Sequence, residues 1–110
     1  MGLFGFGKKK YDKNISRDNE FLKDYAIKVN GLIIFIDNND KVKAELNQLK
    51  DDFQYAVAST DPKAKAIEKN IKRDFDDLAS KLQQPAWDEA EVLMLVKVLR
   101  RSIVEISSLR

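Results

Sequence analysis

Apolar residues recur three and four positions apart along most of this chain, which is the spacing of one face of an α-helix. The pattern divides into four segments, for which we predict helices over about residues 17–36, 40–57, 62–83 and 86–109. The apolar stripes of these segments consist of Leu22, Tyr25, Val29, Leu32 and Ile36; Val42, Leu46, Leu49, Phe53 and Ala56 or Val57; Ile67, Ile71, Phe75, Leu78 and Leu82; and Val92, Leu95 or Val96, Leu99, Ile103 and Ile106.

Turn-forming residues separate the four segments at 37–40, 59–61 and 84–86. Asp61 is predicted to cap the third helix, because Pro62 behind it fits the first helical position, where its missing amide costs nothing. Either Asn39 or Asp40 is predicted to cap the second helix. Short breaks between helices predict an all-α fold, an antiparallel up-down four-helix bundle. If the break at 37–40 is helical instead, the first two helices fuse and a three-helix arrangement with one long helix results.

The first helix contains a possible interruption at Asn30-Gly31. The flanking residues do not alternate cleanly between apolar and polar, so we interpret Gly31 as a glycine that the helix tolerates at a cost of about 1 kcal/mol. A short strand over 32–36 is the competing interpretation, because β-branched and aromatic residues there favour extended chain.

The N-terminal residues differ in composition from the rest. Residues 1–16 hold three of the four glycines and four lysines against one aspartate. Because glycine is a poor helix former, we predict a flexible apolar and basic N-terminal arm over 1–16 and a helical bundle domain over 17–110.

The predicted fourth helix carries apolar residues well outside its stripe. A helix that is apolar over most of its girth must be covered on most sides. This helix is therefore either unusually central in the bundle or part of a contact with a partner. The residues that we predict for such a contact are Leu93, Met94, Val98 and Val104.

The composition excludes most catalytic mechanisms and most kinds of metal site. The chain has no cysteine and no histidine, which excludes disulfides, thiolate or imidazole metal sites and histidine-based acid–base catalysis. No glycine-rich phosphate loop follows a predicted strand, and no serine or threonine has a matching base. We therefore predict a protein that is not an enzyme, with no cofactor, no bound metal and no small-molecule substrate.

Two further residue groups have structural interpretations. Asp74, Asp76 and Asp77 form the densest acidic group, but neighbours on a helix point apart and basic residues are close, so we interpret the group as a solvated face. Aromatic residues at helical spacing are interpreted as core, and Trp87 as packing over the end of the bundle. The residues concerned are Tyr25, Phe53, Tyr55 and Trp87.

For function, these observations favour a helical protein–protein interaction module that self-associates through the fourth helix. The expected partner is another copy of this chain, in a homo-oligomer, or another helical protein. The expected location is the cytoplasm. The net charge of only +2 and the lack of a recognition motif give nucleic-acid binding through the basic arm less support.

The N-terminal arm has three competing interpretations. It can attach to the inner face of an anionic membrane, dock its phenylalanines in a groove of a partner protein, or have no role. In the membrane interpretation apolar side chains enter the interfacial layer while lysines meet anionic headgroups. The residues that would make either contact are Leu3, Phe4, Phe6, Lys8, Lys9 and Lys10.

Overall fold

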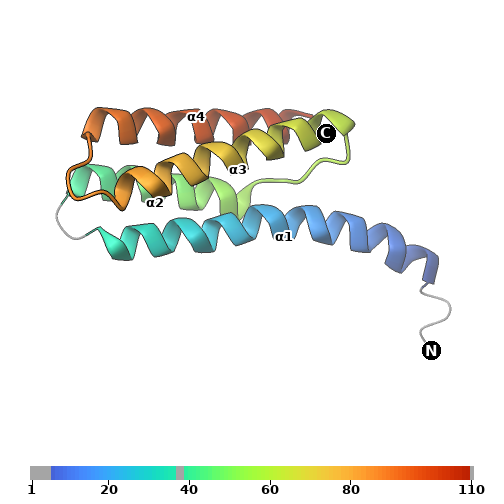
Figure 1. Cartoon of the computed structure of the whole chain (residues 1–110). Helices are drawn as coiled ribbons and strands as arrows, with labels where there is room; N and C mark the ends of the chain where they lie inside the picture. Colours follow the sequence, from blue (N-terminus) through green and yellow to red (C-terminus); the bar gives the residue numbers. More distant parts are fainter. Residues whose placement is uncertain (1–5, 37–38, 110) are drawn as a thin grey trace.

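The described part of the chain folds into four α-helices, as predicted. The computed structural model describes the backbone of residues 6–36 and 39–109 and the side chains of residues 20–36 and 39–109. The helices are α1 (Phe6–Phe35), α2 (Asp40–Tyr55), α3 (Pro62–Leu82) and α4 (Glu89–Ser108). Successive helices run in opposite directions (Figure 1). The break between α1 and α2 rules out the three-helix alternative.

Spatial order differs from chain order, because α2 packs against α1 and α4, and α4 also packs against α3. α2 and α4 run in the same direction (Figure 1). Their N-terminal ends meet where Asn39 Nδ2 donates a hydrogen bond to Glu89 Oε1 over 2.8 Å. Further along, Arg100 of α4 lies 2.6 Å from Asp52 of α2. The helices α2 and α4 are therefore parallel neighbours in the bundle (Figure 1).

Side-chain caps start three of the helices at sharply defined positions. Asn39 Oδ1 accepts a hydrogen bond from the Val42 amide at 3.0 Å, which resolves the choice between Asn39 and Asp40. Asp61 caps α3 as predicted, with Pro62 directly behind it. Asp88 caps α4, and its carboxylate satisfies the amide of Ala90. These amides have no carbonyl partner inside the helix, so each cap removes an unsatisfied donor. Because Asp88 is the cap, α4 begins at Glu89 and not at Ala86.

The predicted stripes form the core. Every stripe residue of α1 is buried, as are four consecutive stripe positions of α2 and those of α3 from Ile71 onward. In α4 the stripe passes through Val96, while Leu95 is only half-buried. Trp87 is half-buried and packs against the core, as predicted. Tyr55 is 75% exposed, so its assignment to the core was wrong. Tyr55 follows Phe53 by two residues and therefore lies off the stripe.

The first helix is longer than predicted at its N-terminal end. It begins at Phe6 and not near Arg17, so part of the predicted arm has helical backbone, whereas residues 1–5 lie outside the described residues. Lysine is a good helix former, and extending an existing helix gains one hydrogen bond for each residue fixed. α1 passes through Gly31 without a break, and residues 32–35 are helical, so the strand interpretation was wrong.

Candidate interaction site

Apolar side chains of α4 are exposed although the helix is packed on two sides. Met94 is 66% and Val104 65% exposed, and Val98 is also exposed. Leu93 is half-buried and packs against the core. Within the described residues α4 packs mainly against α2 and α3, so it is not the enclosed central helix that the sequence left open. Its own bundle therefore leaves part of its apolar surface in water.

The four predicted contact residues do not form one continuous stripe. At about 100° per residue, Leu93 and Val104 fall on the flank of α4 that faces α2. Met94 and Val98 fall on the other flank of α4, the one toward α3. The exposed Arg101 lies between the two flanks. A single flat partner surface therefore cannot cover all four residues equally.

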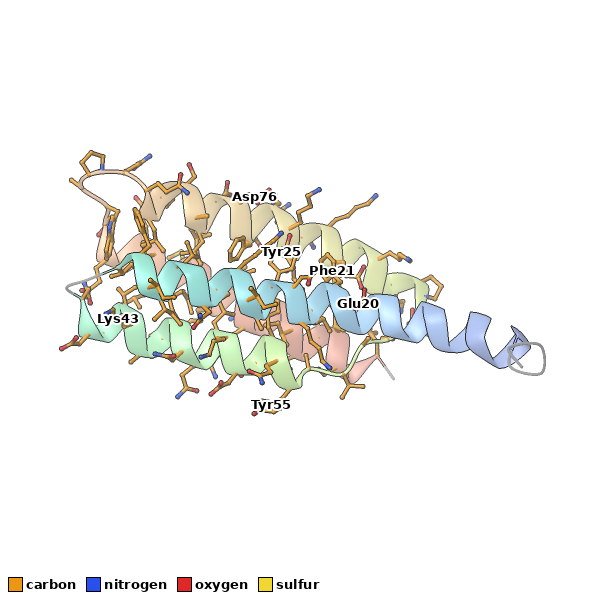
Figure 2. The ribbon with its side chains drawn as sticks, turned by 90° about the horizontal axis from the view of Figure 1, so that it is seen from below. Glu20, Phe21, Tyr25, Lys43, Tyr55 and Asp76 are labelled. Atoms are coloured by element: carbon orange, nitrogen blue, oxygen red, sulfur yellow. The ribbon has the colours of Figure 1, made fainter. Side chains whose placement is uncertain are left out.

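The flank that carries Val104 borders a groove between the C-terminal ends of α2 and α4. Its volume is about 330 Å³. Tyr55 stands on the α2 side of this groove, at the lower edge of the view in Figure 2. Two carboxylates, those of Asp51 and Asp52, line the groove, and no lysine or arginine is among its lining residues. We call it the α2/α4 groove; it is lined by Asp51, Asp52, Tyr55, Ala56, Ile103, Val104 and Ser107.

Within this groove the two carboxylates differ in their partners. Asp52 Oδ2 accepts a hydrogen bond from Arg100 Nε at 2.6 Å, so its charge is largely satisfied inside the protein. Asp51 is exposed at the rim. The groove therefore offers apolar contact between Tyr55 and Val104 with negative charge beside it. Such a site suits a ligand that carries both apolar and cationic groups.

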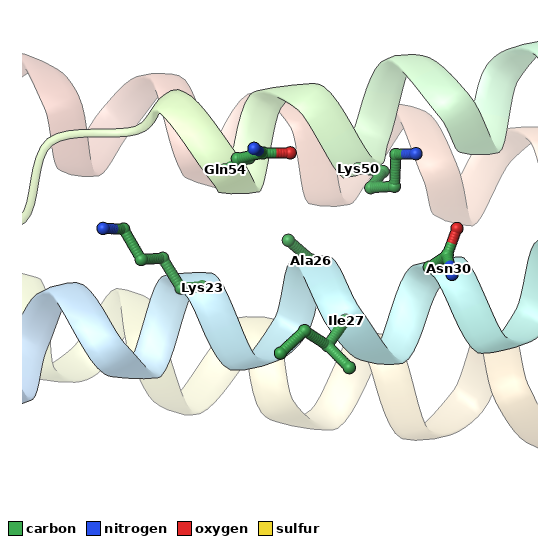
Figure 3. A pocket seen from close by; sticks show the side chains of 6 residues that line it. All are labelled: Lys23, Ala26, Ile27, Asn30, Lys50 and Gln54. Carbon is green, nitrogen blue, oxygen red and sulfur yellow. The ribbon is translucent and has the colours of Figure 1, made fainter.

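A second groove, of about 490 Å³, lies on the opposite flank of α2, against α1. Figure 3 shows Lys23 of α1 opposite Gln54 of α2, and Asn30 opposite Lys50. The exposed Ile27 adds apolar surface. No carboxylate lines this groove, so it lacks an acid–base pair. This groove can offer hydrogen bonds, attraction of anionic groups through its two lysines and apolar contact with Ile27.

Tyr25 anchors α1 to the rest of the bundle and has the most perturbed environment among the described tyrosines. Its ring centroid lies 5.0 Å from that of Phe21, 5.6 Å from Phe53 and 5.1 Å from Phe75. Burial, and then the negative charge of Asp76, raise the pKa of Tyr25. The two residues lie on neighbouring helices (Figure 2). The three ring contacts make this cluster part of the packing between α1, α2 and α3.

The acidic group of α3 only partly matches its predicted role as a solvated face. Asp76 and Asp77 are exposed, but Asp74 is buried, and Arg73 Nε donates to its carboxylate at 3.2 Å. The prediction was therefore wrong for Asp74, which lies three residues after the buried Ile71 on the same side of the helix. Among the described residues no group of acidic side chains is arranged to hold a metal ion.

The predicted contact residues of the arm are only partly visible. Leu3 and Phe4 lie outside the described residues, and the structure describes only the backbone of Phe6 and of Lys8 to Lys10. That backbone belongs to α1, whose N-terminal part projects past the ends of the other helices (Figures 1 and 2). The structure thus separates the lysine-rich segment from the body of its own bundle.

Sequence reasoning found Val104 but missed the groove beside it. Tyr55 and Asp51 were missed because the groove depends on α2 lying next to α4, which no local pattern encodes. One signal was present: Tyr55 does not fit the spacing of the α2 stripe.

In the described part of the chain, no helix combines the length and the apolar character that crossing a bilayer requires. Comparison with family models, with curated proteins and with solved structures finds no match to this chain.

Proposed function

We propose that this chain is a non-enzymatic helical interaction module that self-associates through α4, in the cytoplasm. The observation that carries the proposal is the exposure of Met94 and Val104, each about two-thirds exposed, on a helix whose stripe already fills the core. Removing such apolar surface from water is the main driving force for association between proteins. Val98 adds exposed apolar surface on the flank of α4 that carries Met94, and Tyr55 of α2 adds it beside Val104.

The separation between core and surface residues on α4 supports this proposal. Val96 and Leu99 are buried and hold α4 in the bundle, whereas Met94 and Val104 make no such contribution. A change at the exposed positions therefore tests association without removing core contacts. Leu93 is less suitable for a test, because it packs against the core and its replacement would also destabilise the fold.

The experiment compares the mass in solution of the wild type with that of the double variant Met94→Glu, Val104→Glu across a range of concentrations. We expect a concentration-dependent dimer for the wild type and a monomer for the variant, because two buried charges oppose association. Ile27→Glu is the matched control, because Ile27 is 71% exposed and lies on α1. It should leave the dimer intact. A wild type that stays monomeric at high concentration would refute the proposal.

A second candidate function, attachment to an anionic membrane surface, is favoured by the projection of α1. The segment with Lys8 to Lys10 lies where the bundle does not cover it (Figure 1). Each lysine near an anionic surface contributes about 1 kcal/mol, which gives weak and reversible attachment. Sedimentation with anionic vesicles, but not with neutral ones, should disappear when residues 1–10 are deleted. If the full-length protein does not pellet, this candidate fails.

A further inference from the structure

The α2/α4 groove has a composition that selects for a particular kind of ligand. Between Tyr55 and Val104, both well exposed, it offers apolar contact, and Asp51 adds negative charge at its rim. Apolar helices bind in such grooves between helices, and the surrounding charge determines orientation and partner. The complementary occupant carries bulky apolar side chains next to a cluster of cations.

Residues 1–10 of this chain have that composition. The segment combines three bulky apolar residues, Leu3, Phe4 and Phe6, with three consecutive lysines, and it contains no acidic residue. The groove, in turn, has no lysine or arginine among its lining residues. Charge complementarity therefore points to the N-terminal segment of this same sequence as the occupant.

The segment cannot fill the groove of its own chain without breaking α1. The helix is continuous from Phe6 to Phe35, and its N-terminal part projects away from the bundle (Figure 1). As long as this helix stays intact, its projecting part points away from α2 and α4 of its own chain (Figure 1). The occupant must therefore come from a second copy.

The positions of the segment and the groove also indicate the symmetry. The groove lies at the C-terminal ends of α2 and α4, which is the end of the bundle from which α1 projects (Figure 1). When two copies meet at this end, each can place its α1 extension against the groove of the other. Such a reciprocal exchange closes into a two-fold dimer and does not continue into a filament.

We propose that the lysine-rich N-terminal segment of one copy docks in the α2/α4 groove of a second copy and that the exchange is reciprocal. This inference rests on the proposed self-association and specifies its contact surface. It predicts that Val104 and Tyr55 contact the docked segment, whereas Met94, on the other flank of α4, lies outside the groove.

A charge-reversal experiment tests the electrostatic part. Replacing Lys8, Lys9 and Lys10 by Glu, or Asp51→Lys alone, should raise the dimer dissociation constant, the single change by about fivefold. Combining the two should restore association. Asp77→Lys is the matched control, because Asp77 is an exposed carboxylate of α3 outside the groove, and it should change nothing. If the combined variant associates no better than its parents, the proposal is wrong.

Disulfide trapping tests the position directly, because the chain has no native cysteine. A Lys9→Cys variant is mixed with a tagged Tyr55→Cys variant under mild oxidation. We expect the mixed disulfide to form in preference to either like pair. Tagged Ile27→Cys, exposed to a similar degree on α1, is the control and should react poorly. Equal trapping by both partners would overturn the proposal.

Deleting residues 1–10 separates this proposal from the proposed function. A wild-type dimer that becomes a monomer on deletion supports both. A dimer that survives deletion overturns the docking of the N-terminal segment but leaves self-association through α4 standing. If the wild type is monomeric, both fail.

Discussion

Replacing Phe53 by alanine should destabilise the aromatic cluster in which side chains of α1, α2 and α3 meet. Phe53 lies on α2 and is fully buried. Its ring stacks against Tyr25 of α1 with the centroids 5.6 Å apart, and Tyr25 in turn meets Phe75 of α3 edge-on. Phe53→Ala therefore leaves a cavity where three helices meet, and it removes one of the ring contacts of Tyr25.

The expected loss is large compared with the stability of a small domain. Truncating a buried phenylalanine to alanine costs about 3–5 kcal/mol, from lost burial and from the cavity. The ring pair with Tyr25 accounts for about 0.5–1.5 kcal/mol of that loss. Domains of this kind have a free energy of unfolding of about 5–15 kcal/mol. The variant should therefore lose a substantial fraction of its stability, and its melting temperature should fall accordingly.

Urea unfolding followed by far-ultraviolet circular dichroism measures the loss. Ile34→Ala is the matched control, because it truncates a large apolar side chain that is 72% exposed and lies on α1, outside the α2/α4 groove. It should change the free energy of unfolding by less than about 0.5 kcal/mol. If both variants lose the same amount, the stripe through Phe53 does not form the core, and the assignment of faces on α2 is wrong.

Three further changes test other features of the fold. Asn39→Ala should lower the free energy of unfolding by about 1 kcal/mol, because it removes both the cap of α2 and the hydrogen bond to Glu89. Urea unfolding measures this loss, and an unchanged midpoint would contradict the prediction. Gly31→Ala should raise that free energy by about 0.5–1 kcal/mol, because a methyl group there meets nothing within 4 Å and the position is helical; a lower melting temperature would contradict it. The pKa of Tyr25 is raised by burial and by Asp76, so its stabilising contribution is complete below the ordinary tyrosine pKa of about 10 and is lost as pH rises through the folded pKa. Unfolding measured at rising alkaline pH should show this loss in the wild type and less of it in Tyr25→Phe, and identical curves would refute the assignment.

Local patterns predicted the candidate site only in part. The excess of apolar residues on α4 identified Met94 and Val104, and the structure shows both exposed. Periodicity could not show that these two residues lie on different flanks of the helix, because the neighbours of each flank depend on the packing order. It also could not identify Asp51 as part of a groove. An exposed carboxylate on α2 has no distinctive local signal.

The sequence by itself determined the number of helices, the breaks between them and most of their buried faces, but not the N-terminal extension of α1. Spacing of apolar residues, capping side chains and Pro62 act within a few residues, so they can be read along the chain. Packing order was decided only in the tertiary structure, because several arrangements of four amphipathic helices bury the same stripes. Placing α2 beside α4 pairs Asp52 with Arg100 and leaves Val104 next to Tyr55, residues far apart in sequence. The α2/α4 groove is a consequence of this packing order, since it exists only where those two helices meet.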